Sequence, residues 1–127
     1  KFERAPQGTD TILIDNDKVS VILTDIDENG FWGYTLNLFI ENKTDKEIMI
    51  SGEDVSINGY MADPFYAATV GSNMCAFSSI FWYDEDLESI GILDSSEIEE
   101  IEMILRAYDY NNWNAKDYAQ EKITITP

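Results

Sequence analysis

Hydrophobic and polar residues alternate along several short stretches of the chain, which is the pattern of half-buried β-strands. In residues 101–107, Ile, Met, Leu and Ala stand at every second position, with Glu, Ile and Arg between them. Six other stretches are rich in β-branched and aromatic residues and are bounded by Asp, Asn and Gly. The predicted strands are 11–14, 18–26, 32–41, 47–57, 74–83, 98–110 and 121–126.

The same pattern predicts how neighbouring strands pair. Asn29-Gly30 suits the centre of a type I′ turn, which needs a positive φ at both residues. The pairs that follow from this turn are Val19 with Ile40, Val21 with Leu38, and Leu23 with Leu36. A slip of one residue would move these side chains to the opposite face. Strand 47–57 is expected to continue the meander beside 32–41, after a loop at 43–45.

The segments between the strands indicate the architecture. Residues 58–73 contain Pro64 and Gly71 and alternate weakly, so we expect a long crossover there with room for a helical turn. Residues 84–90 suit a short helix or loop, and 111–120 a polar loop. Seven to eight short strands without a strong helix favour an all-β fold, an antiparallel β-sandwich. We expect a single domain over 1–127, with 1–10 as a flexible leader.

Charge narrows the classes of partner. The chain has 25 acidic and 8 basic residues, a net charge of −17. Such a chain is repelled by nucleic-acid phosphate and by anionic lipid, so no nucleic acid is expected among its partners. No apolar run approaches 18 residues, so no transmembrane segment is expected in this chain.

Residue usage also limits the chemistry. Histidine is absent and Cys75 is the single cysteine, which excludes intrachain disulfides, Cys/His zinc sites and imidazole catalysis. Cys75 lies in apolar sequence and is expected to be a buried, inert thiol. The chain has no phosphate-binding loop or nucleophile elbow, and Asn42-Lys43-Thr44, formally a glycosylation sequon, suits a tight turn. We therefore predict no enzyme activity, no catalytic residues and no cofactor.

One acidic stretch, residues 25–30, suggests a metal site. Asp25, Asp27, Asn29 and Gly30 match the first half of an EF-hand loop. The twelfth position, which needs a bidentate Glu, is Leu36, and the flanks are predicted strands, so an EF-hand is excluded. A weaker calcium site using Asp25, Asp27 and Asn29 remains one alternative, and a solvated turn is the other.

Aromatic residues provide the candidate binding groups. Trp113, Trp82 and Tyr110 lie beside predicted loops or strand ends, where aromatic rings stack on sugars or anchor a protein partner. The alternative is that Trp82, together with Trp32, completes the core, since a sandwich usually buries a tryptophan. Trp113 lies in the polar sequence NNWNAKDY and is the one most expected to be exposed.

Four motifs carry a resemblance to a known family. They are WGY at 32–34, IENKTDK at 40–46, DVSINGYM at 54–61 and LRAYD at 105–109. Together they resemble an immunoglobulin-like domain of secreted or lipid-anchored surface proteins of Gram-positive, often gut-dwelling, bacteria, a family of unknown function. The resemblance implies an immunoglobulin-like sandwich in an extracellular, cell-surface lipoprotein, and it transfers no site residues. Gly71-Ser72-Asn73 departs from a Gly-Lys found in many members.

These observations predict a non-catalytic extracellular surface module for adhesion or for binding a protein or another ligand. Its expected partner is an unknown protein or glycan at the cell surface. Two alternatives remain, a carbohydrate-binding module that uses exposed Trp and Tyr, and a purely structural spacer domain.

Overall fold

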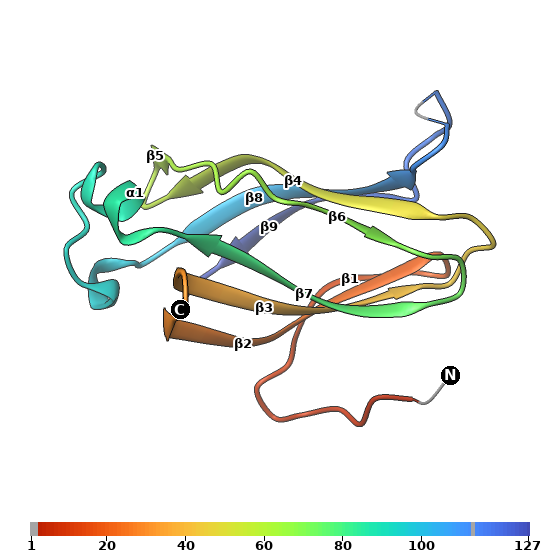
Figure 1. The fold of residues 1–127 in the computed structure, drawn as a ribbon, viewed down its shortest axis with the longest axis horizontal. Coiled ribbons are helices and arrows are strands. Elements are labelled where there is room, and N and C mark those ends of the chain that lie inside the picture. Colours follow the sequence, from red (N-terminus) through yellow and green to blue (C-terminus); the bar gives the residue numbers. More distant parts are fainter. Residues whose placement is uncertain (1–2, 113) are drawn as a thin grey trace.

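Two antiparallel β-sheets face each other in the computed structural model, which describes residues 3–112 and 114–127 (Figure 1). The first sheet has the order β1-β2-β3-β7, with β1 Thr11–Asp15, β2 Val19–Gly30, β3 Gly33–Asn42 and β7 Cys75–Trp82. The second has the order β5-β4-β8-β9, with β5 Tyr60–Met61, β4 Ile48–Ile57, β8 Ile101–Asp109 and β9 Ala119–Ile125. Strand β6, Ala67–Val70, also pairs with β4. The predicted all-β antiparallel sandwich is confirmed, while its immunoglobulin-like character stays a prediction.

The core lies between the sheets and follows the alternation of the sequence. In β8, Ile101, Met103, Leu105 and Ala107 are fully buried, as predicted. The last strand likewise turns Ile123 and Ile125 inward. Each sheet therefore presents one apolar face to the other, and their contact removes that surface from water.

The pairing of β2 with β3 differs from the prediction. Val21 pairs with Ile40 and Leu23 with Leu38, so each partner lies two residues further along than expected. Two register shifts, between Leu23 and Asp25 and between Asp27 and Gly30, change the count along the strand. A displacement of two keeps every side chain on its own face, which is why the apolar pattern cannot detect it.

The predicted type I′ turn also lies elsewhere. The β2–β3 hairpin closes with Gly30 opposite Gly33, so Phe31 and Trp32 form its tip. The two successive positive φ angles occur at the other Asn-Gly pair, with 52° at Asn58 and 83° at Gly59. This pair joins β4 to β5 as a two-residue hairpin, the connection for which Asn-Gly is the strongest short-range signal.

The expected meander of three strands is wrong, because β4 belongs to the second sheet. It pairs with β8, and the place beside β3 is taken by β7, with Leu38 opposite Ser78 and Leu36 opposite Ile80. The chain changes sheets at Asn42, which is fully buried and hydrogen-bonds the turn that follows it. This confirms the tight-turn interpretation of Asn42-Lys43-Thr44.

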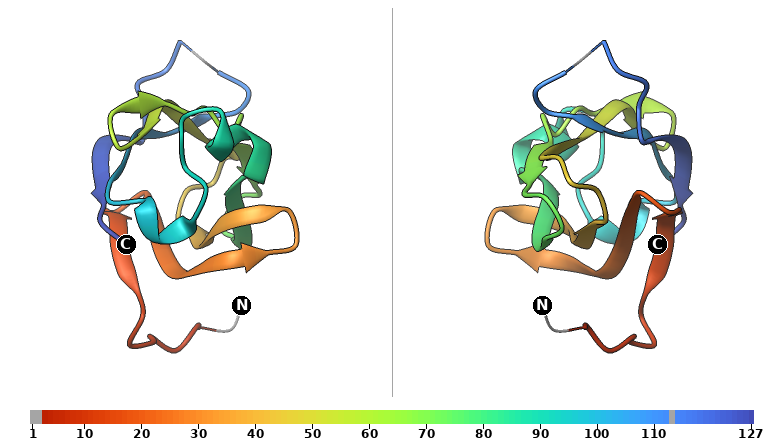
Figure 2. Two further views of the ribbon diagram at one scale, coloured as in Figure 1. Left: turned by 90° about the vertical axis from the view of Figure 1, so that its left-hand side faces the viewer. Right: turned by 90° about the vertical axis from the view of Figure 1, so that its right-hand side faces the viewer.

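The remaining segments close the two ends and one outer face. The crossover at 58–73 holds β5 and β6 and not a helical turn, whereas 84–90 does contain a short helix, α1, Asp84–Glu88. A 3-10 turn, η1, Ser95–Glu97, follows near the β2–β3 hairpin (Figure 2). Residues 3–10 run along the outer face of the first sheet (Figure 1), where the Arg4 guanidinium lies 5.4 Å from the centre of the Phe39 ring.

Among the described residues, no helix has the length and apolarity needed to cross a membrane.

Candidate functional site

The tip of the β2–β3 hairpin presents two aromatic side chains to solvent. Phe31 is 88% exposed and Trp32 is 56% exposed. Gly33, which follows them, has a φ of 138°, and a side chain there would collide with the backbone carbonyl oxygen of Trp82. Glycine thus lets the hairpin lie against β7, and the tight tip leaves both rings outside the core.

The end of β7 extends this aromatic surface. Phe81 points outward from β7 opposite Thr35, and Tyr83 follows the strand. The ring centres of Trp32 and Phe81 are 6.5 Å apart with planes at 27°. Phe31 lies edge-on to Trp32 at 4.6 Å, and Tyr83 edge-on to Phe81 at 5.6 Å. We call these four residues, Phe31, Trp32, Phe81 and Tyr83, the aromatic patch.

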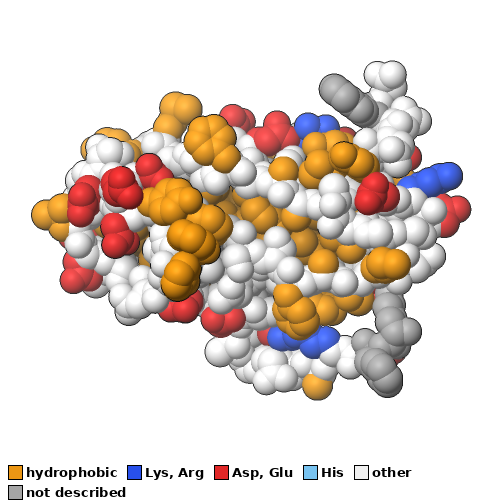
Figure 3. Space-filling view, in the orientation of Figure 1, with side chains coloured by type: hydrophobic (Ala, Val, Ile, Leu, Met, Phe, Trp, Pro, Cys, Tyr) orange, Lys and Arg blue, Asp and Glu red, His pale blue; other side chains and the backbone are white. Residues whose placement is uncertain are grey.

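Acidic residues border the patch on the side of α1. Asp84, Glu85 and Asp86 follow Tyr83 directly, and Asp27 and Glu28 precede the hairpin tip. Figure 3 shows hydrophobic side chains gathered where β7 ends, beside a group of acidic side chains. No Lys or Arg occurs in residues 19–42 or 47–105, so the segments that carry the aromatic patch have only acidic residues as charged side chains.

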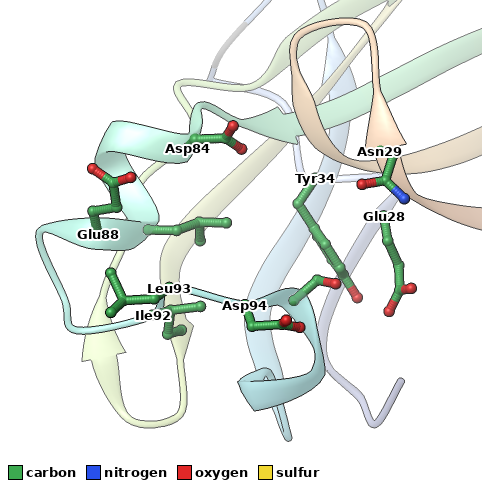
Figure 4. A pocket seen from close by; sticks show the side chains of 10 residues that line it. Glu28, Asn29, Tyr34, Asp84, Glu88, Ile92, Leu93 and Asp94 are labelled. Carbon is green, nitrogen blue, oxygen red and sulfur yellow. The ribbon is translucent and has the colours of Figure 1, made fainter.

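A pocket of about 260 Å³ lies between the hairpin and the segment that runs from α1 to η1 (Figure 4). Its lining includes four carboxylates, of Glu28, Asp84, Glu88 and Asp94. Tyr34 also lines it, although that residue is only 1% exposed and its ring packs 6.3 Å from the ring of Trp82. The Tyr34 hydroxyl has no hydrogen-bond partner among the described residues.

The surroundings of Tyr34 keep its hydroxyl protonated. Burial raises the pKa of Tyr34 to about 12, and the negative charge of Glu28 makes a smaller contribution in the same direction. Asp94 behaves in the opposite way, because hydrogen bonds from Ser96 lower the pKa of its carboxyl. At neutral pH this pocket therefore combines a neutral phenol with ionised carboxylate at Asp94.

The positions of Trp82 and Trp32 differ from those predicted for binding residues and core residues. Trp82 is 1% exposed and its indole N–H donates to the carbonyl oxygen of Ala62 at 2.7 Å, so it lies in the core, as the alternative expected, and not at the surface. Trp32, expected in the core, is instead exposed. The signal for this was its place between Gly30 and Gly33, at a hairpin tip. Trp113 lies outside the described residues.

Tyr110, the third predicted binding residue, is exposed but lies away from the aromatic patch. Tyr110 directly follows β8. Its backbone N–H donates to the carbonyl oxygen of Glu47, the residue before β4. In Figure 1 the loop after β8 projects from the end of the sandwich opposite the β2–β3 hairpin. The structure thus does not join Tyr110 to the aromatic patch.

The candidate metal ligands serve local hydrogen bonds. The Asp25 carboxylate accepts from the side chains of Thr24 and Asn37, and the Asp27 carboxylate accepts from the backbone N–H of Asn29. Within the described part of the chain, no three His, Cys, Asp or Glu side chains are grouped so as to hold a metal ion. Cys75, expected to be buried, is only partly buried and lines a groove under the N-terminal segment.

No protein-family model matches the sequence, and no match is found among curated proteins or among solved structures.

Proposed function

We propose that this chain is a non-catalytic extracellular binding module that attaches to a basic protein partner through the aromatic patch. The observation that carries the proposal is the patch itself, four aromatic side chains gathered at one end of the first sheet. Aromatic residues dominate the energetics of protein interfaces because they bury large surfaces with few rotatable bonds.

The rings of the patch are pre-organised. Trp32 and Phe81 pack against each other, and each is further supported by an edge-on neighbour. Side chains that hold their positions before binding lose less conformational entropy on binding, which leaves more of the contact energy for affinity.

The geometry favours a protein partner over a glycan. Two of the three ring contacts are close to perpendicular, at 88° and 84°, so the patch presents ring edges as well as faces. Sugar rings stack best on a flat aromatic face, whereas the side chains of a protein interface fill an uneven apolar surface. The two Phe rings of the patch have no polar atom, and Trp32 has only its indole N–H. These three rings therefore offer few directed hydrogen bonds to the hydroxyl groups of a sugar.

The acidic border of the patch fits a basic partner. Asp84, Glu85 and Asp86 lie next to Tyr83, and no Lys or Arg is present in residues 47–105. A field of one sign accelerates association with a partner of the opposite sign and disfavours acidic competitors. The lack of histidine and of nucleotide-binding motifs supports a non-catalytic role. The place at the surface of a Gram-positive cell, as part of a lipoprotein, rests on the resemblance of the sequence motifs.

Binding to a panel of host and bacterial surface proteins, cell-wall fragments and glycans tests the proposal. For a protein that binds, Trp32→Ala should raise Kd about tenfold or more, as expected for an anchor at the centre of an interface. Phe77→Ala is the matched control, since Phe77 is 75% exposed on the outer face of the same sheet but pairs with Phe39, outside the patch. Binding to glycans alone, or protein binding that Trp32→Ala leaves unchanged, would contradict the proposal.

A further inference from the structure

The pocket beside the aromatic patch has features that the patch does not explain. It lies between β3 and the segment from α1 to η1, and four of its lining residues are acidic. Within the described residues, none of these four carboxylates forms an ion pair, whereas those of Asp10, Asp15, Glu53, Glu102 and Asp117 each do. The pocket is therefore an uncompensated concentration of negative charge in a concave space.

Tyr34 supplies a second and independent indication of a ligand. Buried polar atoms in folded proteins almost always have a hydrogen-bond partner, and this hydroxyl has none among the described residues. Figure 4 shows the Tyr34 side chain reaching from β3 toward Asp94, with the side chain of Glu28 running beside it. The ring is buried and packs near Trp82, so the position of the side chain that lines the pocket is set by the core.

The chemistry of the lining selects the class of ligand. A calcium ion needs six to eight oxygen ligands at 2.3–2.6 Å, and the described residues contain no cluster that could hold a metal. A primary ammonium group carries one positive charge and three donors that point in different directions, and it binds acceptors at longer range. The side chains of Leu87 and Ile92 line the same pocket and offer apolar surface to an alkyl chain.

From this geometry we propose that the pocket binds a primary alkylammonium group, with Tyr34 Oη and the Glu28 carboxylate as acceptors and Leu87 and Ile92 against the alkyl chain. The source of the ammonium group is a lysine side chain of the partner protein. This second statement rests on the proposed function, since the hairpin that carries Phe31 and Trp32 also carries Glu28 and Asn29 at the pocket. The affinity of the pocket for an amine does not depend on it.

The test is an NMR titration of the isolated chain with Nα-acetyl-lysine N-methylamide, with sodium chloride of equal ionic strength as reference. We expect saturable shifts of resonances in the pocket, and a Kd at least threefold higher for Tyr34→Phe and for Glu28→Gln. Tyr66→Phe is the matched control, because the Tyr66 hydroxyl donates to Ser78 at 2.8 Å and lies outside the pocket. Spectra of the free variants establish that each one is folded.

Several outcomes overturn the inference. They are shifts that sodium chloride reproduces, binding that Tyr34→Phe and Glu28→Gln leave unchanged, tighter binding of the corresponding arginine derivative, and localised shifts with calcium chloride. A lysine-bearing partner would lose affinity with Glu28→Gln and with Trp32→Ala, whereas the lysine derivative alone would respond to Glu28→Gln and not to Trp32→Ala. If the derivative binds and no partner protein does, the pocket stands and the proposed function fails. If a partner binds through Trp32 and the derivative does not bind, the inference fails.

Discussion

At the scale of single residues, Asn42 decides where the chain goes after β3. Its side-chain N–H groups donate to the carbonyl oxygens of Lys46, Val70 and Gly71 at 2.7–3.1 Å. Its amide oxygen accepts from the backbone N–H and the hydroxyl of Thr44. One buried amide thus satisfies backbone groups of the turn and of the end of β6, and this network replaces a direct hairpin from β3 to β4.

We predict that Asn42→Ala lowers the free energy of unfolding by about 3 kcal/mol, because several buried hydrogen bonds lose one partner at once. Asn42→Asp should cost more, since a carboxylate would face three carbonyl oxygens and has no donors for them. Urea denaturation measures both effects. Asn111→Ala, in an exposed loop, is the control and should change stability by no more than about 0.5 kcal/mol. A similar small change for Asn42→Ala would show that the network does not stabilise the fold.

At the scale of elements, the β2–β3 hairpin shows the limit of local turn signals. Asn-Gly occurs at 29–30 and at 58–59, and only the second pair takes up the two positive φ angles. The first pair lies in β2, because Gly30 pairs with Gly33 and the close approach of Gly33 to Trp82 fixes the tip at Phe31 and Trp32. Packing against β7 therefore overrides the local preference.

The two glycines give a matched pair of variants. Gly33→Ala should destabilise the fold by about 3 kcal/mol or more, because a methyl group there meets a backbone oxygen in addition to an unfavourable φ. Gly59→Ala should cost about 1 kcal/mol, since its φ is also positive but a side chain there meets nothing. Thermal or urea unfolding compares them. Equal losses for the two variants would contradict the close contact of β3 with β7.

The N-terminal segment is a second element whose attachment can be tested. Arg4 donates two hydrogen bonds to the Asp10 carboxylate at 2.8 and 2.7 Å, and the backbone N–H of Gln7 donates a third at 3.0 Å. These contacts lower the pKa of Asp10 to about 2, and the hydrogen bonds from Arg4 have the largest effect. A carboxyl whose pKa is lower in the folded state stabilises it above its ordinary pKa, near 3.8, and loses that contribution as the pH falls through about 2.

Asp10 lies within the segment and acts through Arg4, whose guanidinium it holds 5.4 Å from the centre of the Phe39 ring on the first sheet. We therefore predict that residues 3–10 detach from the first sheet between about pH 4 and pH 2, seen as a loss of amide-exchange protection confined to the segment and to its contacts. Asp10→Asn should detach it at neutral pH. Asp45→Asn removes one exposed carboxylate elsewhere and should leave the segment attached. Retention of the segment in Asp10→Asn would show that other contacts hold it.

At the scale of the whole molecule, charge is unevenly distributed. All eight Lys and Arg residues lie at positions 1, 4, 18, 43, 46, 106, 116 and 122, so long segments of both sheets are purely acidic. The described ion pairs lie outside the aromatic patch and its pocket. With a net charge of −17, self-repulsion opposes the compact state.

Salt should consequently stabilise this protein. We predict that raising sodium chloride from low to moderate concentration increases Tm, because ions screen the repulsion between surface carboxylates. Potassium chloride at equal ionic strength should act alike, which separates screening from binding of a particular cation. A Tm that is unchanged or lower in salt would mean that the ion pairs of Arg106, Lys122 and Lys43 outweigh the repulsion.

The sequence by itself determined seven of the strands, their buried faces and the class of fold, but not β5 and β6 in the crossover. These follow from alternation, which is a local property of each strand, and the seven predicted strands are all present. It also indicated an acidic, aromatic-rich chain. It could not distinguish registers that differ by two residues, since both keep the same side chains inside.

Only the tertiary structure decided which strands are neighbours and which aromatic residues reach solvent. Every inner strand offers the same kind of apolar face, so the choice of β7 and not β4 as the neighbour of β3 depends on contacts distant in sequence, such as those of Asn42 with Val70 and Gly71. That choice buries Trp82 beside Tyr34 and leaves Trp32 outside. The candidate site is thus a product of packing between segments that no local pattern connects.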